Sequence, residues 1–227
     1  MKKEPGQESA DKSVRPYRSV IRQEAAERTR LRILDAALSL YTTQGYARTT
    51  IDQIAAVAQV ARPTVFSAVG TKAEILKVLR DRALAGDDEP IPVIQRPWYQ
   101  EALLEADPIV SIRLHARNLA RIYQRYAELD AVIHQAAGVD ADLADFARLA
   151  ESQRRLGANT FIRALINKAA LRDGLGEEAA TDALWALTGS DTYRRLVIER
   201  SWKPQDYQNW MSISLTAYLL GTEPKAC

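Results

Sequence analysis

The chain has 227 residues but a single cysteine, Cys227. One thiol excludes an intrachain disulfide and a thiolate metal cluster, and it suits a reducing compartment. The only two histidines, His115 and His134, stand 19 positions apart, which is no metal-binding spacing. The opening residues lack the apolar core of a signal peptide, and no window reaches the roughly 18 apolar residues of a membrane span. We therefore expect a cytoplasmic protein that binds no metal, needs no cofactor and does not enter a membrane.

Turn-forming residues are also scarce. Ten glycines and nine prolines are few for this length, which disfavours an all-β sandwich with its many turns. Long stretches rich in alanine, leucine, arginine and glutamate favour helices instead. With 47% hydrophobic and 26% charged residues, the chain does not have the composition of a disordered protein. The predicted fold class is all-α.

Net charge is small overall, at +2, but unevenly distributed. Residues 1–85 hold 15 Lys and Arg against 9 Asp and Glu, or +6, whereas residues 86–227 sum to −4. A basic amino-terminal third suits a polyanionic partner. If the basic segment contained no binding motif, chance variation in surface residues would be the better explanation of this charge asymmetry.

Such a motif occupies residues 49–72. Apolar residues at helical spacing recur twice in it, before and after a short interruption at residues 59–61: Ile51, Ile54, Ala55 and Ala58, then Val65, Phe66 and Val69. The second helix restarts at Arg62-Pro63, because proline suits the first turn of a helix. Two short helices joined by about three residues match the helix-turn-helix, whose second helix enters a DNA major groove. The motif predicts DNA recognition.

Helix-capping signals frame the motif on both sides. Thr50 with Gln53, and Thr71 with Glu74, have the spacing of capping boxes. Such caps occur wherever helices begin, but helix amino termini also attract phosphate. Thr50 and Lys72 are therefore candidate contacts to the DNA backbone as well.

Composition divides the chain into four segments. Residues 1–20 read as a flexible basic arm, in which Arg15 and Arg18 could reach a minor groove, although a solvated tail is the commoner outcome. Residues 21–85 form the helix-turn-helix domain with its connecting helix, and residues 86–97 an irregular acidic linker. Residues 98–222 carry long helical patterns and are expected to form a helical bundle that binds an effector and dimerises.

Residues 31–79, LRILDAALSLYTTQGYARTTIDQIAAVAQVARPTVFSAVGTKAEILKVL, resemble the DNA-binding domain of TetR-type transcriptional regulators. Residues 185–207 resemble the carboxy-terminal region of some members. The resemblance implies an all-helical homodimer, with operator-reading helices at one end and an effector-binding core in the larger domain. Several positions depart from the usual family pattern, notably Gln59, Phe66, Ala68 and Val69.

DNA-contact candidates follow from this alignment of motifs. Arg62 is the best candidate for base reading, since arginine makes two hydrogen bonds to guanine, although contact with phosphate is an equal alternative. Lys72 is assigned to phosphate. The remaining candidates are the exposed or apolar positions of the second helix, Ala61, Pro63, Thr64, Phe66 and Ser67.

The larger domain offers less specific signals. The helices around Ala180–Leu187 and Tyr207–Leu220 are expected to form the dimer core, or else to pack within one subunit. Aromatic residues and histidines on the long helices could line a cavity for a small apolar or aromatic effector, although ordinary core packing explains such patterns equally well: His115, Tyr123, His134, Phe146, Phe161, Trp185 and Tyr193.

Together these features predict a transcriptional regulator, in the role of a repressor that binds a palindromic operator in double-stranded DNA as a homodimer and is released by a small-molecule effector. An enzyme is not expected, since the chain has no Gly-rich phosphate loop, nucleophile elbow or His-x-x-x-His pair. The alternative is a helical interaction or DNA-binding protein without a small-molecule ligand.

Overall fold

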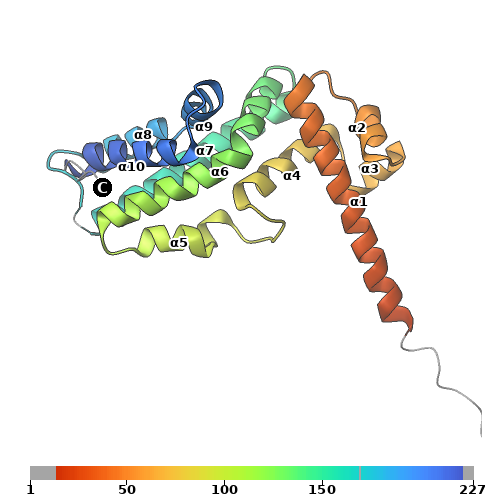
Figure 1. Ribbon diagram of the computed structural model, residues 1–227, viewed down its shortest axis with the longest axis horizontal. Coiled ribbons are helices and arrows are strands. Elements are labelled where there is room, and N and C mark those ends of the chain that lie inside the picture. The colour runs from red at the N-terminus through yellow and green to blue at the C-terminus, as the bar shows by residue number, and fades with distance from the viewer. Residues whose placement is uncertain (1–13, 169, 222–227) are drawn as a thin grey trace, which may run out of the picture.

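The computed structural model describes residues 14–168 and 170–221, with side chains from residue 21 onward. The chain folds into a small amino-terminal domain and a larger body, as Figure 1 shows. The small domain consists of α1 (Val14–Gln44), α2 (Ile51–Ala58), α3 (Arg62–Ala68) and α4 (Lys72–Ala85). No strand occurs in the part of the chain that is described. The predicted all-α class is confirmed.

The body is organised around one long central helix, α6. In chain order it contains a short 3-10 turn (Val93–Gln95), α5 (Pro97–Leu104), α6 (Pro108–Ala137), α7 (Ala141–Ile166), α8 (Glu177–Leu187), α9 (Ser190–Tyr193), a π-helical segment (Arg194–Glu199) and α10 (Pro204–Leu220). Helix α6 packs against α4, α5, α7, α9 and α10. It therefore contacts the connecting helix α4 directly.

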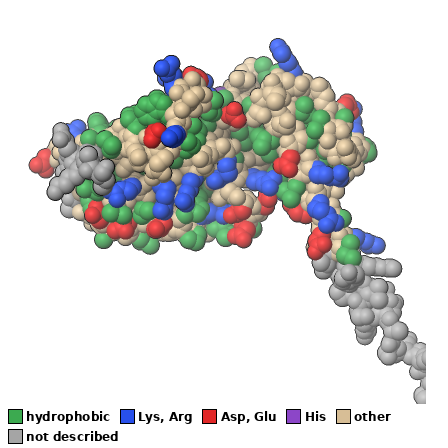
Figure 2. Space-filling model, in the orientation of Figure 1, with side chains coloured by type: hydrophobic (Ala, Val, Ile, Leu, Met, Phe, Trp, Pro, Cys, Tyr) green, Lys and Arg blue, Asp and Glu red, His purple; other side chains and the backbone are tan. Residues whose placement is uncertain are grey.

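The small domain buries the faces that the sequence pattern predicts. Fully or almost fully buried side chains from all of its helices meet in one core: Ile33, Leu34, Ala37, Tyr41, Ile54, Ala58, Val65, Ile75 and Leu76. Helix α1 enters this core only with its second half, because residues 21–28 are all exposed. Its first half projects from the molecule (Figure 1), and arginine side chains lie along the helix in Figure 2.

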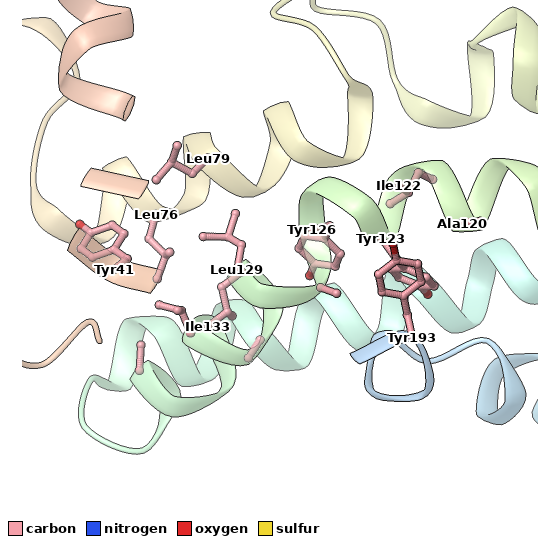
Figure 3. Close-up of a cluster of buried hydrophobic side chains, with 14 of the residues drawn as sticks. Tyr41, Leu76, Leu79, Ala120, Ile122, Tyr123, Tyr126, Leu129, Ile133 and Tyr193 are labelled. Atoms are coloured by element: carbon pink, nitrogen blue, oxygen red, sulfur yellow. The ribbon is translucent and has the colours of Figure 1, made fainter. Parts of the chain in front are cut away.

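One continuous apolar core joins the two parts of the molecule. Figure 3 shows Tyr41 and Leu76 of the small domain beside Leu129 and Ile133 of α6, with Tyr126 farther along the same helix. Each of these side chains is at most 6% exposed. Because protein interiors are closely packed, a shift of α6 is felt at α1 and α4.

One predicted boundary needs correction. Helix α1 begins at Val14, so the arm predicted for residues 1–20 is wrong for residues 14–20, which are helical. Residues 1–13 and the side chains of Arg15 and Arg18 lie outside the described residues. The long helical patterns of residues 98–222 correspond to α6, α7, α8 and α10, whereas the short helices α5 and α9 were not predicted.

None of the described helices combines the length and the apolar character needed to cross a membrane. Within the same residues, His, Cys, Asp and Glu side chains form no group of three or more that could hold a metal ion.

Candidate functional site

Two capping boxes and a strained turn position the short helix α3. The backbone amide of Gln53 donates to the Thr50 hydroxyl at 3.2 Å and that of Glu74 to the Thr71 hydroxyl at 3.3 Å, while each Gln or Glu side chain accepts from the cap amide in return. Both predicted capping boxes are confirmed. Between α2 and α3, Gln59 adopts a left-handed backbone with φ 54° and ψ 49°, the conformation that glycine takes more easily. The turn between α2 and α3 therefore contains a left-handed glutamine at a position where glycine would be less strained.

Helix α3 presents one face to solvent and anchors itself through Val65, which is fully buried. The exposed side chains on it are those of Arg62, Pro63, Phe66 and Ser67, next to exposed Ala61 at the cap. Phe66 was expected on the buried stripe but is 44% exposed, which corrects that assignment. Thr64 is only half exposed.

The side chain of Arg62 lies across the exposed face of the motif. Its guanidinium is 3.6 Å from the Asp52 carboxylate of α2 and 5.8 Å from the centre of the Phe66 ring. Both charged side chains are mostly exposed, so the ion pair is weak and can be exchanged for another partner. The guanidinium of Arg62 thus lies over the Phe66 ring and remains accessible.

Lys72 has a structural role that the sequence patterns did not predict. Its ammonium donates to the carbonyl oxygens of Tyr46 at 3.0 Å and Thr49 at 3.1 Å, and it lies 3.9 Å from the centre of the Tyr46 ring. Burial lowers the pKa of Lys72, while the nearby Asp140 raises it. The ammonium is thus occupied in holding the turn between α1 and α2, and a phosphate can reach it only through its remaining donor.

The same turn is tied to the body of the protein. The Tyr46 hydroxyl donates to the Asp140 carboxylate at 3.1 Å, and Asp140 also caps the amino terminus of α7. At the other end of α4, the Arg125 guanidinium of α6 donates to the Ala83 carbonyl at 3.0 Å. The small amino-terminal domain is therefore held against α6 and α7 at two separate points.

A cavity of about 890 Å³ lies inside the body, next to these contacts. Its walls come from Arg30 of α1, the carboxy-terminal half of α4, the linker, α5, α6, α7 and the junction of α8 with α9. A cavity of this size falls within the range of small-molecule sites. Since α4 begins directly after α3 and ends in the cavity wall, a single helix connects the two features.

The structure places only two of the predicted effector residues in the cavity wall, His115 and Tyr123. The other five do not line it, so the prediction that they share one cavity needs correction. Phe161 and Tyr193 are buried in the core, His134 is half exposed, and Phe146 and Trp185 pack against arginine side chains instead. Helical periodicity places a residue on a face but does not tell which part of that face is filled by a neighbouring helix.

Burial keeps His115 neutral. Its ring stacks on Phe161 with 4.0 Å between ring centres, and burial lowers the pKa of His115 to about 4. Tyr123 is held in the wall by its hydroxyl, which donates to the Thr188 carbonyl. Both side chains therefore offer flat, largely apolar surfaces to the cavity.

Other polar residues of the wall were not identified from the sequence. Arg154 donates to the Glu151 carboxylate and to the Trp185 carbonyl, which joins α7 to α8. Burial alone would raise the pKa of Glu151, but Arg154 outweighs it, and the pKa lies below its usual value. The i, i+3 spacing of Glu151 and Arg154 was visible in the sequence, but such pairs usually lie on solvated faces.

The acidic linker is held together by a buried arginine. Arg96 is only 4% exposed, and its guanidinium donates to the Asp87 carboxylate and to the carbonyls of Glu89 and Ile91. Through this hydrogen bond, Arg96 holds the pKa of Asp87 below its usual range. The linker is thus an ordered wall of the cavity.

Comparison with known proteins agrees with this arrangement. Residues 33–79 match the domain described as bacterial regulatory proteins, tetR family. Over 102 residues the chain is 35% identical to the HTH-type transcriptional regulator SrpR of Pseudomonas putida, covering 44% of this chain and 48% of SrpR. The same identity over 102 residues relates it to the HTH-type transcriptional regulator TtgW, also of Pseudomonas putida, covering 44% of this chain and 76% of TtgW. The chain thus spans about half of SrpR and three quarters of TtgW.

Among solved structures, the complex of SmeT with triclosan superposes with a TM-score of 0.64, covering 88% of this chain and 98% of SmeT. SmeT is described as the repressor of the Stenotrophomonas maltophilia multidrug efflux pump SmeDEF. Sequence identity is 18%, so this likeness concerns the fold alone.

Proposed function

This chain belongs to the TetR family of bacterial transcriptional regulators, and from that premise we propose that it is a repressor that binds a palindromic operator as a homodimer and leaves it when a small molecule fills the cavity. The observation that carries the proposal is the course of α4. This helix starts beside the exposed helix α3 and ends in the cavity wall. A ligand that changes the position of α4 changes the position of α3.

DNA contact is assigned to the exposed face of α3 and the cap before α2. Arg62, Pro63 and Ser67 are accessible there, and Thr50 lies exposed at the amino terminus of α2, where amide groups attract phosphate. Exposed Arg48 next to that cap is a further candidate that the sequence patterns did not single out. Arg62 remains the candidate for base reading because it is bound only by a weak, exposed ion pair.

A homodimer supplies the second reading helix. One helix reads few base pairs, so useful affinity requires two half-sites. The outward face of α8 and α10 supports this assembly, since it carries small and apolar exposed side chains: Ala179, Ala186, Ile213 and Ala217. Ile213 is 52% exposed in the isolated chain.

Regulation by a small molecule rests on the cavity. The fold neighbour SmeT is known with triclosan bound, which supports a ligand role for the corresponding domain. Binding would favour one arrangement of α4 over another, and the effect on DNA binding is limited by the ligand's difference in affinity for the two arrangements.

The base-reading role of Arg62 has a direct test. We expect Arg62→Ala to lower the discrimination between operator and scrambled duplex by about 1–3 kcal/mol, because a bidentate contact to guanine is lost. Lys72→Ala should weaken binding to both duplexes alike and also destabilise the domain, since its ammonium holds the turn before α2. Fluorescence anisotropy titrations of the two variants on both duplexes distinguish these effects. A uniform loss for Arg62→Ala would remove it from base reading.

A further inference from the structure

Most charged groups around the cavity are paired with a partner of opposite sign. Arg154 pairs with Glu151 at 2.8 Å, Arg80 with Asp81 at 3.1 Å, and Arg82 with Asp88 at 3.3 Å. Arg30 lies 3.7 Å from Asp88, and buried Arg96 pairs with Asp87. The four arginines that line the cavity are therefore all neutralised by carboxylates of the protein.

Asp130 on α6 differs from these residues. It lines the cavity, is 7% exposed, and forms no ion pair with a lysine or arginine among the described residues. Its carboxylate accepts hydrogen bonds from two neutral hydroxyls, one from Tyr126 at 2.5 Å and one from Ser190. Glu89 is the other cavity-lining carboxylate without such a pair, but it is exposed and therefore solvated.

Two other groups approach this carboxylate. The half-exposed imidazole of His134 lies 3.7 Å from it and carries a charge only when protonated. Arg80 acts on the Tyr126 hydroxyl, the group that also donates to Asp130, and opposes the increase in the pKa of that phenol caused by burial and by Asp130. A buried charge is costly unless a partner of opposite sign accompanies it. Asp130 therefore has two hydroxyl donors but no lysine or arginine ion-pair partner among the described residues.

We propose that the cavity selects a cationic ligand with an aromatic body, whose ammonium group pairs with Asp130. The proposal rests on the ligand-binding role assigned to the cavity above. An ammonium would complete a charge-assisted interaction that the two hydroxyls only partly supply. A neutral or anionic head group would leave the carboxylate without a counter-charge.

The aromatic residues of the wall suit the same ligand. Trp98, Tyr99, Tyr123 and Tyr126 line the cavity with Asp130, so a flat apolar body finds ring faces on several sides. The faces of tryptophan and tyrosine rings also attract a cation. Charge and shape of the site therefore favour the same class of molecule.

Three probes with one biphenyl body test the proposal: 4-phenylbenzylamine, 4-phenylbenzyl alcohol and 4-biphenylacetate. They differ in head group, which is cationic, neutral or anionic at neutral pH. Isothermal titration calorimetry on the full chain should show that the amine binds at least about tenfold more tightly than the alcohol, with the acid weakest, as expected for a charge-assisted contact. Equal or tighter binding of the alcohol or the acid, or no binding of the amine, would overturn the proposal.

Substitutions test whether Asp130 causes the preference for the amine. Asp130→Asn keeps the shape and an acceptor but removes the charge, so it should weaken amine binding about tenfold and leave alcohol binding nearly unchanged. Asp145→Asn, at an exposed carboxylate of α7 that pairs with Arg148 and does not line the cavity, is the matched control and should retain the preference. Ser190→Ala also retains the charge and should retain the preference, which covers the case in which Asp130→Asn fails to fold. Equal loss of amine and alcohol in a folded Asp130→Asn, or loss of the preference in Ser190→Ala, would contradict the assignment.

Failure of the proposed function remains distinguishable from failure of this inference. DNA binding is measured on the same preparations without any probe. If the protein does not bind DNA but still prefers the amine, the proposed repressor function is rejected and the proposed site for a cation stands. If the protein binds DNA but does not prefer the amine, the proposed site for a cation is rejected and the proposed regulatory function stands.

Discussion

At the scale of single residues, Gln59 shows how the helix-turn-helix motif tolerates local backbone strain. Its left-handed backbone closes the turn between α2 and α3, and its amide donates to the Ala55 and Ala56 carbonyls. For a residue with a side chain this conformation costs about 1–2 kcal/mol, whereas glycine adopts it freely. Packing of α2 and α3 on α1 must offset this cost.

We therefore expect Gln59→Gly to raise the free energy of unfolding by about 1 kcal/mol. Urea denaturation followed by circular dichroism measures the change. Ser67→Gly, inside the short helix α3 with an ordinary helical backbone, is the control and should destabilise by a similar amount. A Gln59→Gly variant that is less stable than the parent would show that the turn is not strained.

His115 makes stability depend on pH. Burial lowers its folded-state pKa to about 4, below the ordinary value of 6.5, so the unfolded chain binds the proton more readily between these values. The contribution of neutral His115 is therefore complete above pH 6.5 and is lost as the pH falls toward 4. By linkage this loss reaches about 3 kcal/mol.

The expected result is that the wild-type chain loses about 2–3 kcal/mol more than His115→Gln when the pH falls from 7 to 4.5. Urea unfolding curves of both proteins at the two pH values provide the comparison. His134→Gln removes the other histidine, keeps His115 and should behave like the wild type. If the wild type and His115→Gln showed the same pH dependence, the ring would not be buried and neutral.

At the scale of elements, the linker after α4 depends on one arginine. Arg96 satisfies two carbonyls and one carboxylate of residues 87–91, and Asp88 is bound in addition by Arg30 and Arg82. An acidic segment punctuated by prolines predicted an irregular link. Its order could not be predicted, because it depends on non-local hydrogen bonds of Arg96 within the linker and on Arg30 and Arg82, which come from α1 and α4.

Replacing Arg96 by methionine should lower the free energy of unfolding by about 2–3 kcal/mol, since Asp87 and two carbonyls lose a buried donor. The linker should also become sensitive to limited proteolysis. Urea unfolding and a protease time course measure both effects. Arg113→Met on the exposed surface of α6 should change stability by less than about 0.5 kcal/mol. Equal stability of Arg96→Met and Arg113→Met would mean that Arg96 does not hold the linker.

Elements marked by local signals were predictable. The capping boxes at Thr50 and Thr71 depend on neighbours only a few residues away, and both are found. The site was predictable only in part. Arg62 is exposed as expected, but the ammonium of Lys72 is bound by the turn at Tyr46 and Thr49, a contact across more than twenty residues that no local pattern reveals.

At the scale of the whole molecule, function depends on how the two parts are joined. A continuous core links α1 and α4 to α6, and Tyr46 and Arg125 add hydrogen bonds at the two ends of this contact. The position of the cavity could not be predicted from the sequence either, since it results from the packing of segments that lie far apart in the chain, from Arg30 to Ser190. His115 and Tyr123 were found because they share the inner face of α6, and Asp130 on the same helix was missed.

The central claim is that this regulator reads a two-fold symmetric DNA site through α3. Selection of bound duplexes from a random library by the purified full chain tests it most directly. We expect enriched sequences with two inverted half-sites about one helical turn apart, to which binding weakens steeply as salt concentration rises. Arg62→Ala should enrich sites with relaxed preference at one position in each half-site. A library without enrichment, or enrichment of single sites without symmetry, would contradict the account.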